Sequence, residues 1–255
     1  MVSWIDDKNL EIDDTRFILE PMARMPTTAG LFVLRKTRWM TEQYLALAAE
    51  PGLANIFELG IDQGGSTALF ALLFRPRRLV AIDIDPEPKD ALAQFTLVGN
   101  NGERVSPHYG IDQADRATVE AILEREFGSE PLDLVIDDAS HQARETTASF
   151  NTLFPRLRPG GSYVIEDWEW DHAYERAFRA DPELLDSRST GTQSSVGPSR
   201  LVLELALASG SSPETVAELT IRHGFVIVRR GPASLDTEGF DISSCSGEIG
   251  RRVLR

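Results

Sequence analysis

Short apolar runs that alternate with helix-length segments dominate the pattern of this 255-residue chain. Five runs have the length and composition of strands: 55–59, 79–83, 105–109, 132–136 and 162–165. Helical segments are predicted at 67–73, at 114–127 and, from apolar residues at Phe150, Leu153, Phe154 and Leu157, between the fourth and fifth runs. This alternation predicts an α/β fold with a Rossmann-like, doubly wound and mostly parallel sheet.

The N-terminal part of the chain has a weaker pattern. Residues 1–27 are polar and rich in acids, and they fit either a disordered leader or a segment that folds over a substrate. A helix is predicted over 31–50, where Pro51-Gly52 would end it. We therefore expect residues 1–50 to form a helical cap on the sheet.

The last third of the chain is also irregular. Residues 181–199 are rich in Ser, Thr, Gly and Pro, which predicts a lid loop at the ligand edge of the sheet or an insertion without a role. A helix is expected at 201–208, a helix or strand at 213–223 and a last strand at 225–228. Without a repeat or a clear boundary, we expect residues 1–255 to form a single domain.

Acids gather where two of the predicted strands end. Asp137, Asp138 and then His141 follow the fourth run, whereas Glu166 and Asp167 follow the fifth, after a predicted Pro-Gly-Gly turn at 159–161. The carboxyl ends of parallel strands share one edge, where such sheets bind ligands. We therefore expect these residues to meet in one site. Capping of loops and helices is the alternative, although it explains only one or two acids per loop.

A glycine-containing turn, residues 60–65, follows the first strand, with Ser66 as the predicted N-cap of the next helix. Such a turn usually meets a nucleotide-like cofactor. The dinucleotide pattern G-x-G-x-x-G is broken, because Asp62 stands where a glycine would approach the pyrophosphate, and no G-K-[ST] follows. Glu58 adds another negative charge. These features favour a cationic cofactor without phosphates, such as S-adenosylmethionine.

Two further strand ends offer candidate cofactor contacts. Asp83 ends the second strand at the distance from the glycine turn that is expected of the acid that binds ribose hydroxyls, or it caps a loop together with Asp85. Asp112 and Gln113 follow the third strand. These two fit the adenine amino group and the start of the next helix equally well.

Composition narrows the classes of partner. The formal net charge of −14 disfavours nucleic acid and anionic membrane surfaces. The single cysteine, Cys245, excludes an internal disulfide and fits a reducing compartment. The N-terminus lacks the basic and apolar regions of a signal peptide, and no apolar run approaches the roughly 18 residues of a membrane helix. We therefore expect a cytoplasmic protein.

The motifs ELGIDQGGST, VAIDIDP, YGIDQAD, VIDDASH and RPGGSYVIEDW resemble those of class I S-adenosylmethionine-dependent methyltransferases. The run DDxSH followed by RPGG and IEDW is similar, more narrowly, to the metal-dependent O-methyltransferases that act on macrolide sugars, rhamnosides and mannose oligosaccharides. The resemblance covers about residues 56–168 and implies a mostly parallel sheet with an antiparallel last strand. Ala139 departs from it, since the family often has glycine there.

The resemblance also implies roles for individual residues. The metal ligands would be Asp138, Glu166 and Asp167, and the general base would be His141. The cofactor contacts would fall on Glu58, Gly60, Ser66, Asp83 and Asp112. Gln113 and Asp137 are added as cofactor-binding candidates from their place at strand ends, although Asp137 fits a contact with the methionine end of the cofactor or a role in loop structure.

Carboxylates with a single histidine favour Mg²⁺ over Zn²⁺ as the metal. Histidine, with an ordinary pKa of about 6.5, is suited to take a proton from an acceptor hydroxyl that the metal has acidified. A structural hydrogen-bonding role for His141 remains open. Trp168, Trp170 and Tyr174 fit stacking on a sugar face or packing equally well.

We therefore predict Mg²⁺-dependent methyl transfer from S-adenosylmethionine to a sugar hydroxyl of a small glycoside or oligosaccharide acceptor. The alternatives are a catechol or small-phenol O-methyltransferase and a non-catalytic protein that binds S-adenosylmethionine. The sequence leaves open which sugar and which hydroxyl react, and whether the chain forms a homo-oligomer.

Overall fold

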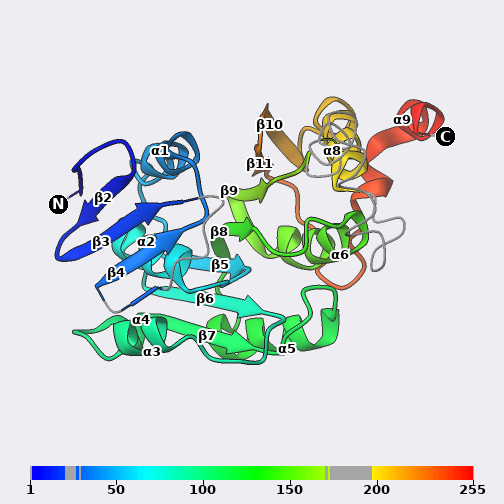
Figure 1. The fold of residues 1–255 in the computed structure, drawn as a ribbon. Coiled ribbons are helices and arrows are strands. Elements are labelled where there is room, and N and C mark those ends of the chain that lie inside the picture. Colours follow the sequence, from blue (N-terminus) through cyan, green and yellow to red (C-terminus); the bar gives the residue numbers. More distant parts are fainter. Residues whose placement is uncertain (1, 21–26, 29, 170–171, 173–196, 255) are drawn as a thin grey trace, which may run out of the picture. The chain divides into compact units, whose positions relative to one another are not determined.

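The structure, a computed structural model, describes residues 2–20, 27–28, 30–169, 172 and 197–254 (Figure 1). The chain divides into two compact units, Met1–Ala139 and Ser140–Arg255, which are treated separately below. The expectation of a single domain stays a prediction. The described helices include none with the length and hydropathy needed to cross a membrane.

A four-stranded sheet forms the N-terminal part of the first unit. Its order is β1 (Val2–Trp4), β2 (Asn9–Ile12), β3 (Thr15–Leu19) and β4 (Leu31–Leu34). The first three strands pair in antiparallel fashion, and β4 pairs with β3 in parallel. Burial alternates along β2 and β3, where Leu10, Ile12, Phe17 and Leu19 face the core.

The expected helical cap over residues 1–50 is therefore wrong. Residues 31–34 are a strand, and helix α1 spans only Arg38–Leu47, where the Thr37 hydroxyl caps it by accepting a hydrogen bond from the Met40 N–H at 3.2 Å. Apolar residues at every second position of β2 and β3 have the period of a strand. The acids around the Asp13 turn, where φ is +52°, hid this short alternation in a polar segment.

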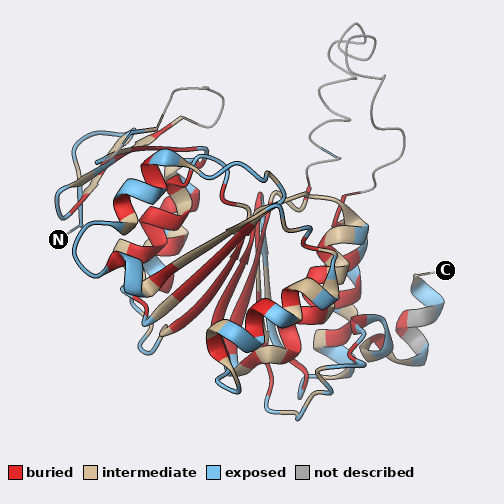
Figure 2. Cartoon of the chain, turned by 90° about the horizontal axis from the view of Figure 1, so that it is seen from below, coloured by how far each residue is buried: buried red, intermediate tan, exposed pale blue. Residues whose placement is uncertain are grey.

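The main sheet of the first unit is parallel. Its strands are β5 (Asn55–Leu59), β6 (Arg78–Asp83), β7 (Val105–Tyr109) and β8 (Leu132–Asp137), in the order β8-β5-β6-β7. Every residue of β5 and β8 is buried, as expected of parallel strands covered on both faces (Figure 2). The helices of this unit, besides α1, are α2 (Gly65–Phe74), α3 (Asp90–Thr96), α4 (Asn101–Arg104) and α5 (Arg116–Phe127).

The start of α2 differs from the prediction. Its N-cap is Gly64, not Ser66, which lies inside the first turn of the helix. Gly64 has a φ of +84°, and a Cβ there would lie 2.8 Å from the Cβ of Leu92. Both the left-handed backbone and the contact with α3 require glycine at this position.

The second unit contains an antiparallel sheet in the order β10-β11-β9. These strands are β9 (Leu157–Glu166), β10 (Val216–Arg222) and β11 (Phe225–Arg230). The other elements are α6 (Ala143–Leu153), η1 (Phe154–Arg156), α8 (Ser199–Ser211), η3 (Ile242–Ser246) and α9 (Gly247–Val253). Residues 159–161, predicted to form a turn, lie within β9 instead, with Gly160 at a φ of +77°.

The predicted fold class is confirmed. The strands β5 to β8 pair in parallel and alternate with helices, whereas the last strand, β11, runs antiparallel to β9. The proposed lid at 181–199 cannot be compared in full, because residues 181–196 lie outside the described residues, and Ser199 already begins α8.

The N-terminal sheet should contribute strongly to the stability of the first unit. Phe32 of β4 is fully buried, and its ring lies 5.8 Å from the rings of Phe17 and Phe95, centroid to centroid. We expect Phe32→Ala to lower the free energy of unfolding by about 3–5 kcal/mol, because it leaves a cavity between β3 and α3. Urea denaturation measures this loss. Ile5→Ala, at a half-exposed position, is the control, and equal stability of the two variants would contradict the packing described here.

Candidate functional site

Glu58, near the end of β5, is a fully buried acid. Neither oxygen of its carboxyl makes a hydrogen bond of normal geometry with the described residues. Burial raises the pKa of this carboxyl from 4.5 to about 7, although the nearby hydroxyls of Ser66 and Thr67 and the charge of Lys36 oppose the rise. A buried carboxyl without a hydrogen-bond donor suits a cationic ligand, which is the kind of cofactor that the turn predicts.

Gly60 begins the glycine turn directly after β5. Its φ is +95°, and a Cβ at this position would lie 2.2 Å from the backbone oxygen of Asp138. The Asp138 N–H in turn donates to the Leu59 oxygen at 2.9 Å. Glycine is therefore required here because the ends of β5 and β8 approach each other closely, and the turn lies directly beside Asp138.

Asp83 holds the glycine turn in place. One carboxylate oxygen accepts hydrogen bonds from the N–H groups of Ile61 and Asp62 at 2.7 and 2.9 Å. The other oxygen accepts from the Asp85 N–H at 2.8 Å. These bonds support the loop-capping interpretation, and binding of ribose hydroxyls by Asp83 stays a prediction.

Two neighbours at the end of β7 have different surroundings. The carboxylate of Asp112 accepts a hydrogen bond from the Ala114 N–H at 2.8 Å within the turn, whereas the N-cap of α5 is Asp115. The side chain of Gln113 is buried, and its amide nitrogen lies 3.3 and 3.4 Å from the carboxylate oxygens of Asp137. Gln113 and Asp137 therefore form a polar pair. Both belong to the predicted cofactor-binding residues.

A buried lysine that no sequence pattern predicts neutralises the charge of Asp138. The Nζ of Lys36 donates to Oδ2 of Asp138 at 2.6 Å, and the Lys36 side chain is only 2% exposed. Its ammonium also lies 5.8 Å from the centroid of the Tyr44 ring. The 102 residues between the partners explain why no local pattern could predict this ion pair.

His141 and Asp167 lie together in the second unit. The Nε2 of His141 is 4.0 Å from Oδ2 of Asp167. Both residues have left-handed backbones, with φ values of +52° and +50°, and the Asp167 N–H donates to the Gly224 oxygen at 3.0 Å. Strained backbones of this kind are concentrated at functional sites. Glu166, immediately before Asp167, is a buried residue at the end of β9.

Asp138 is the last strand-end acid of the first unit. The short chain between Asp138 and His141 limits the distance between these two residues. The two residues are three positions apart in the sequence. Connectivity alone therefore keeps their α-carbons within about 11 Å of each other. Whether Asp138, Glu166 and Asp167 share one cation stays a prediction at this point.

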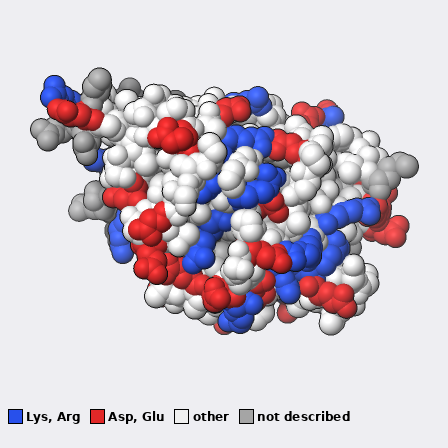
Figure 3. Space-filling view, turned by 180° about the vertical axis from the view of Figure 1, so that it is seen from behind, with Lys and Arg blue, Asp and Glu red and all other residues white. Residues whose placement is uncertain are grey.

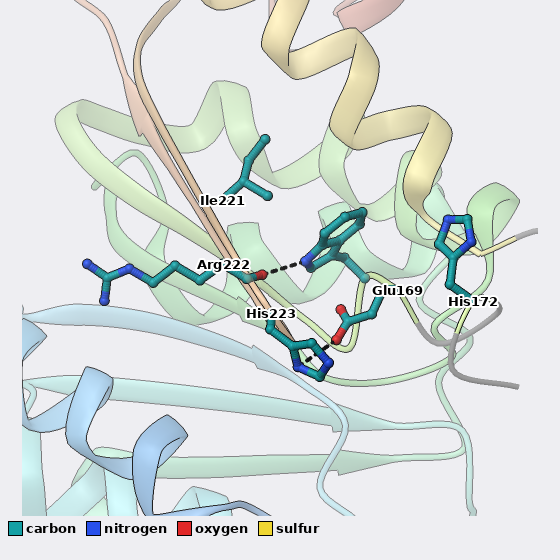
Figure 4. Close-up of a pocket in the computed structure, with 6 residues that line it drawn as sticks. Glu169, His172, Ile221, Arg222 and His223 are labelled. Atoms are coloured by element: carbon teal, nitrogen blue, oxygen red, sulfur yellow. Dashed lines mark hydrogen bonds and ion pairs between the residues drawn. The ribbon is translucent and has the colours of Figure 1, made fainter. Parts of the chain in front are cut away.

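A pocket of about 410 Å³ lies in the second unit, where the chain leaves β9 and meets the β10–β11 hairpin (Figure 4). It is lined by Trp168, Glu169, His172, Ile221, Arg222 and His223. The indole N–H of Trp168 donates to the Arg222 oxygen at 2.7 Å, and Nδ1 of His223 lies 3.1 Å from Oε1 of Glu169. Trp170 and Tyr174, the other predicted stacking residues, lie outside the described residues.

Charges of both signs cover the face of the molecule in Figure 3, where Lys and Arg side chains lie among Asp and Glu side chains. Such mixing gives this face no single-sign field of the kind that a phosphate backbone requires. The expectation that nucleic acid is not a partner stays a prediction that rests on the net charge of −14.

Comparison with known proteins finds one family that matches part of this chain. The family described as "Methyltransferase domain" matches residues 57–168, from the middle of β5 to Trp168. Residues 57–168 resemble a methyltransferase domain. The domain thus contains Glu58, the glycine turn, the Asp137-Asp138 pair, His141 and the acids at the end of β9.

Curated relatives of this chain are named O-methyltransferases, and one name, 8-demethyl-8-alpha-L-rhamnosyl tetracenomycin-C 2'-O-methyltransferase from Streptomyces olivaceus, includes a rhamnosyl group. The chain is 32% identical over 174 residues to a demethylmacrocin O-methyltransferase from Streptomyces fradiae and 33% identical over 175 residues to a mycinamicin VI 2''-O-methyltransferase from Micromonospora griseorubida. Each alignment covers 66% of this chain and 40% of the relative. The chain therefore spans less than half the length of these relatives.

A solved structure shares the fold. It is the MycE methyltransferase from the mycinamycin biosynthetic pathway in complex with Mg and SAH, at a TM-score of 0.52 and 25% sequence identity. The match covers 77% of this chain and 50% of that one. Together with the parallel strands β5 to β8 and the antiparallel β11, this likeness identifies the fold as that of class I methyltransferases.

The burial of Glu58 generates a prediction about pH. In the folded protein its carboxyl keeps its proton up to a pH of about 7, whereas in the unfolded chain it loses the proton near 4.5. The folded state should therefore lose stability as the pH rises through this window, by about 3 kcal/mol at most. Glu58→Gln removes this loss, so that the difference in unfolding free energy between variant and wild type should grow from pH 4.5 to 8.

Urea denaturation of the ligand-free protein at a series of pH values measures this difference. Asp62→Asn, which neutralises a half-exposed acid in the same turn, serves as the control. A constant difference between Glu58→Gln and wild type across the window would show that the Glu58 carboxyl titrates normally.

Proposed function

We propose that this chain catalyses Mg²⁺-dependent transfer of a methyl group from S-adenosylmethionine to a sugar hydroxyl of a glycoside or oligosaccharide. The observation that carries the proposal is the pairing of His141 with Asp167 at the end of a strand of a methyltransferase domain. The rhamnosyl group in the name of one relative supports a sugar acceptor, and the complex of MycE with Mg and SAH supports the metal and the cofactor.

The cofactor side of the proposal rests on the glycine turn. The buried carboxyl of Glu58, which has no hydrogen-bond partner among the described residues, fits the positive charge of S-adenosylmethionine. The Ser66 hydroxyl lies near the Glu58 carboxyl. Gly60 has no side chain, and the turn can therefore lie against the backbone of Asp138. We assign the remaining contacts to Asp83, Asp112, Gln113 and Asp137, which follow the neighbouring strands β6, β7 and β8.

The donor set fits a hard cation. Asp138, Glu166 and Asp167 offer carboxylate oxygens, the ligands that Mg²⁺ prefers. When bound, the cation lowers the pKa of the acceptor hydroxyl and fixes its direction. Lys36 holds Oδ2 of Asp138 at 2.6 Å and so orients its other oxygen, in the way that hydrogen bonds orient metal-binding carboxylates in general.

His141 is assigned the role of general base. The distance of 4.0 Å between its Nε2 and Oδ2 of Asp167, an assigned metal ligand, supports this role, because an acidified hydroxyl at the metal would lie near the imidazole. When bound, S-adenosylmethionine would supply its methyl group to the hydroxyl oxygen and become S-adenosylhomocysteine, while the His141 imidazole would take the hydroxyl proton. Holding donor and acceptor in line supplies much of the rate, because it removes the entropic cost of bringing them together.

Methyl transfer in the presence and absence of Mg²⁺ tests this proposal. Mass spectrometry should detect a gain of one methyl group on a member of a panel of rhamnosides, mannosides and macrolide glycosides, and excess EDTA should abolish it. His141→Ala should lower kcat by about 10²–10⁴-fold, as expected for the loss of a general base. Its dissociation constant for S-adenosylmethionine should not change.

His108→Gln provides a matched control, because His108 lies on β7 and contacts Ser106 and Glu126 rather than the strand-end acids. Full activity in EDTA would refute the metal-dependent mechanism. Activity on catechols that survives His141→Ala would indicate a phenol methyltransferase, and binding of S-adenosylmethionine without product from any acceptor would indicate a non-catalytic protein.

A further inference from the structure

The pocket of Figure 4 lies beside the proposed metal ligand Asp167 in the second unit. The hairpin between β10 and β11 turns at His223 and Gly224, and Gly224 has a φ of +68°. A Cβ on Gly224 would lie 3.8 Å from Oδ1 of Asp167 and 3.7 Å from Oε1 of Glu169. The two carboxylates therefore face the same glycine, so that the pocket begins next to Asp167.

Glu169 is an unusual pocket residue because it is a buried acid. Only 8% of the residue is exposed. One carboxylate oxygen, Oε1, pairs with Nδ1 of His223 at 3.1 Å. The other, Oε2, has no hydrogen-bond partner among the described residues. A buried carboxylate oxygen without a donor loses its hydration and gains nothing in return, unless a ligand supplies the donor.

The rest of the lining consists of an indole, an aliphatic side chain, two histidines and an arginine. Trp168 is fixed by the bond from its indole N–H to the Arg222 oxygen, and Ile221 is 45% exposed. Figure 4 shows the guanidinium of Arg222 extending to the far side of the hairpin from Glu169. The pocket thus combines an indole, an aliphatic side chain and a hydrogen-bond acceptor, and the Arg222 charge is directed away from Glu169.

These features distinguish between classes of ligand. A carboxylate accepts hydrogen bonds from hydroxyl groups, and aromatic and aliphatic side chains pack on the C–H faces of a ring. A phosphate or carboxylate on the ligand would be repelled by the carboxylate of Glu169. A catechol ring, once both its hydroxyls lie at the metal, has no hydroxyl left for Glu169.

We propose that this pocket is an acceptor subsite for a neutral, hydroxyl-rich sugar ring, in which Oε2 of Glu169 accepts a hydrogen bond from a hydroxyl that is not methylated. This inference rests on the proposed function and narrows it, because it selects neutral glycosides over sugar phosphates and over phenols. His223 is a positioning residue, since it holds the Glu169 carboxylate from the hairpin tip.

Kinetics of Glu169→Gln in the full-length chain test the subsite. The variant keeps the size of the side chain and removes its charge. We expect KM for a neutral glycoside to rise about ten-fold, because a neutral amide oxygen replaces a charged hydrogen-bond acceptor, with a smaller change in kcat. The dissociation constants for S-adenosylmethionine and Mg²⁺ should stay within two-fold of wild type, and the melting temperature should report folding. Glu218→Gln, at an exposed acid of the same hairpin, is the matched control.

A monodeoxy series of the acceptor identifies the hydroxyl. Removal of the hydroxyl that bonds Glu169 should weaken binding to wild type about ten-fold and have little further effect on Glu169→Gln. Mannose 1-phosphate should bind at least ten-fold more weakly than a methyl mannoside. Equal kinetics of Glu169→Gln and Glu218→Gln on an active acceptor would refute the subsite and leave the proposed function standing.

Saturation-transfer NMR with the same glycosides separates the two proposals. Binding that Glu169→Gln weakens, without methyl transfer by wild type, would support the subsite and refute the proposed function. Absence of both binding and transfer across the panel would refute both. Preferred binding of the phosphorylated sugar would also overturn the subsite.

Discussion

Acids at the carboxyl ends of strands must be compensated when they are buried, and this constraint governs most of the site. Asp83 accepts three backbone hydrogen bonds and thereby fixes the glycine turn. Asp137 faces the amide of Gln113, and Asp138 is paired with the buried ammonium of Lys36. Each interaction offsets the desolvation of one carboxylate and determines the shape of the neighbouring loop.

The acids with incomplete compensation are the ones to which we assign ligands. Glu58 has no normal hydrogen bond to the described residues and has a pKa raised to about 7, which fits a site for a cationic cofactor. Glu169 has one oxygen paired with His223 and the other unpaired among the described residues, which fits a site for a hydroxyl donor. His141 and Asp167, whose backbones are strained, are assigned to the proton transfer and to the metal in the proposed reaction.

The sequence predicts those parts of this molecule that depend on local patterns. The buried runs of β5 and β8, the parallel order and the antiparallel β11 all follow from apolar periodicity and from the family motifs, and the structure confirms them. The sequence pattern does not predict strands β2 and β3, because their alternation of apolar and polar residues spans only four or five residues between acids. The local pattern predicts Ser66 as the N-cap, because nothing local shows that Gly64 must pass against Leu92.

Long-range pairs lie beyond such patterns. The partners Lys36 and Asp138 are 102 residues apart, and no periodicity links them. The Glu169–His223 pair depends on the hairpin that carries His223, in a segment that fitted a helix or a strand equally well. The assigned metal ligands come from different strand ends, so that their roles require direct measurement.

Isothermal titration of Mg²⁺ into the full-length chain, saturated with S-adenosylhomocysteine, tests the central assignment most directly. The account predicts one ion per chain for wild type, and an affinity at least about ten-fold weaker for both Asp138→Asn and Asp167→Asn, since each variant loses a charged ligand. Asp236→Asn, at an exposed acid of the loop after β11, should bind as wild type does. Unchanged Mg²⁺ affinity in both ligand variants, or no Mg²⁺ binding by wild type, would contradict it.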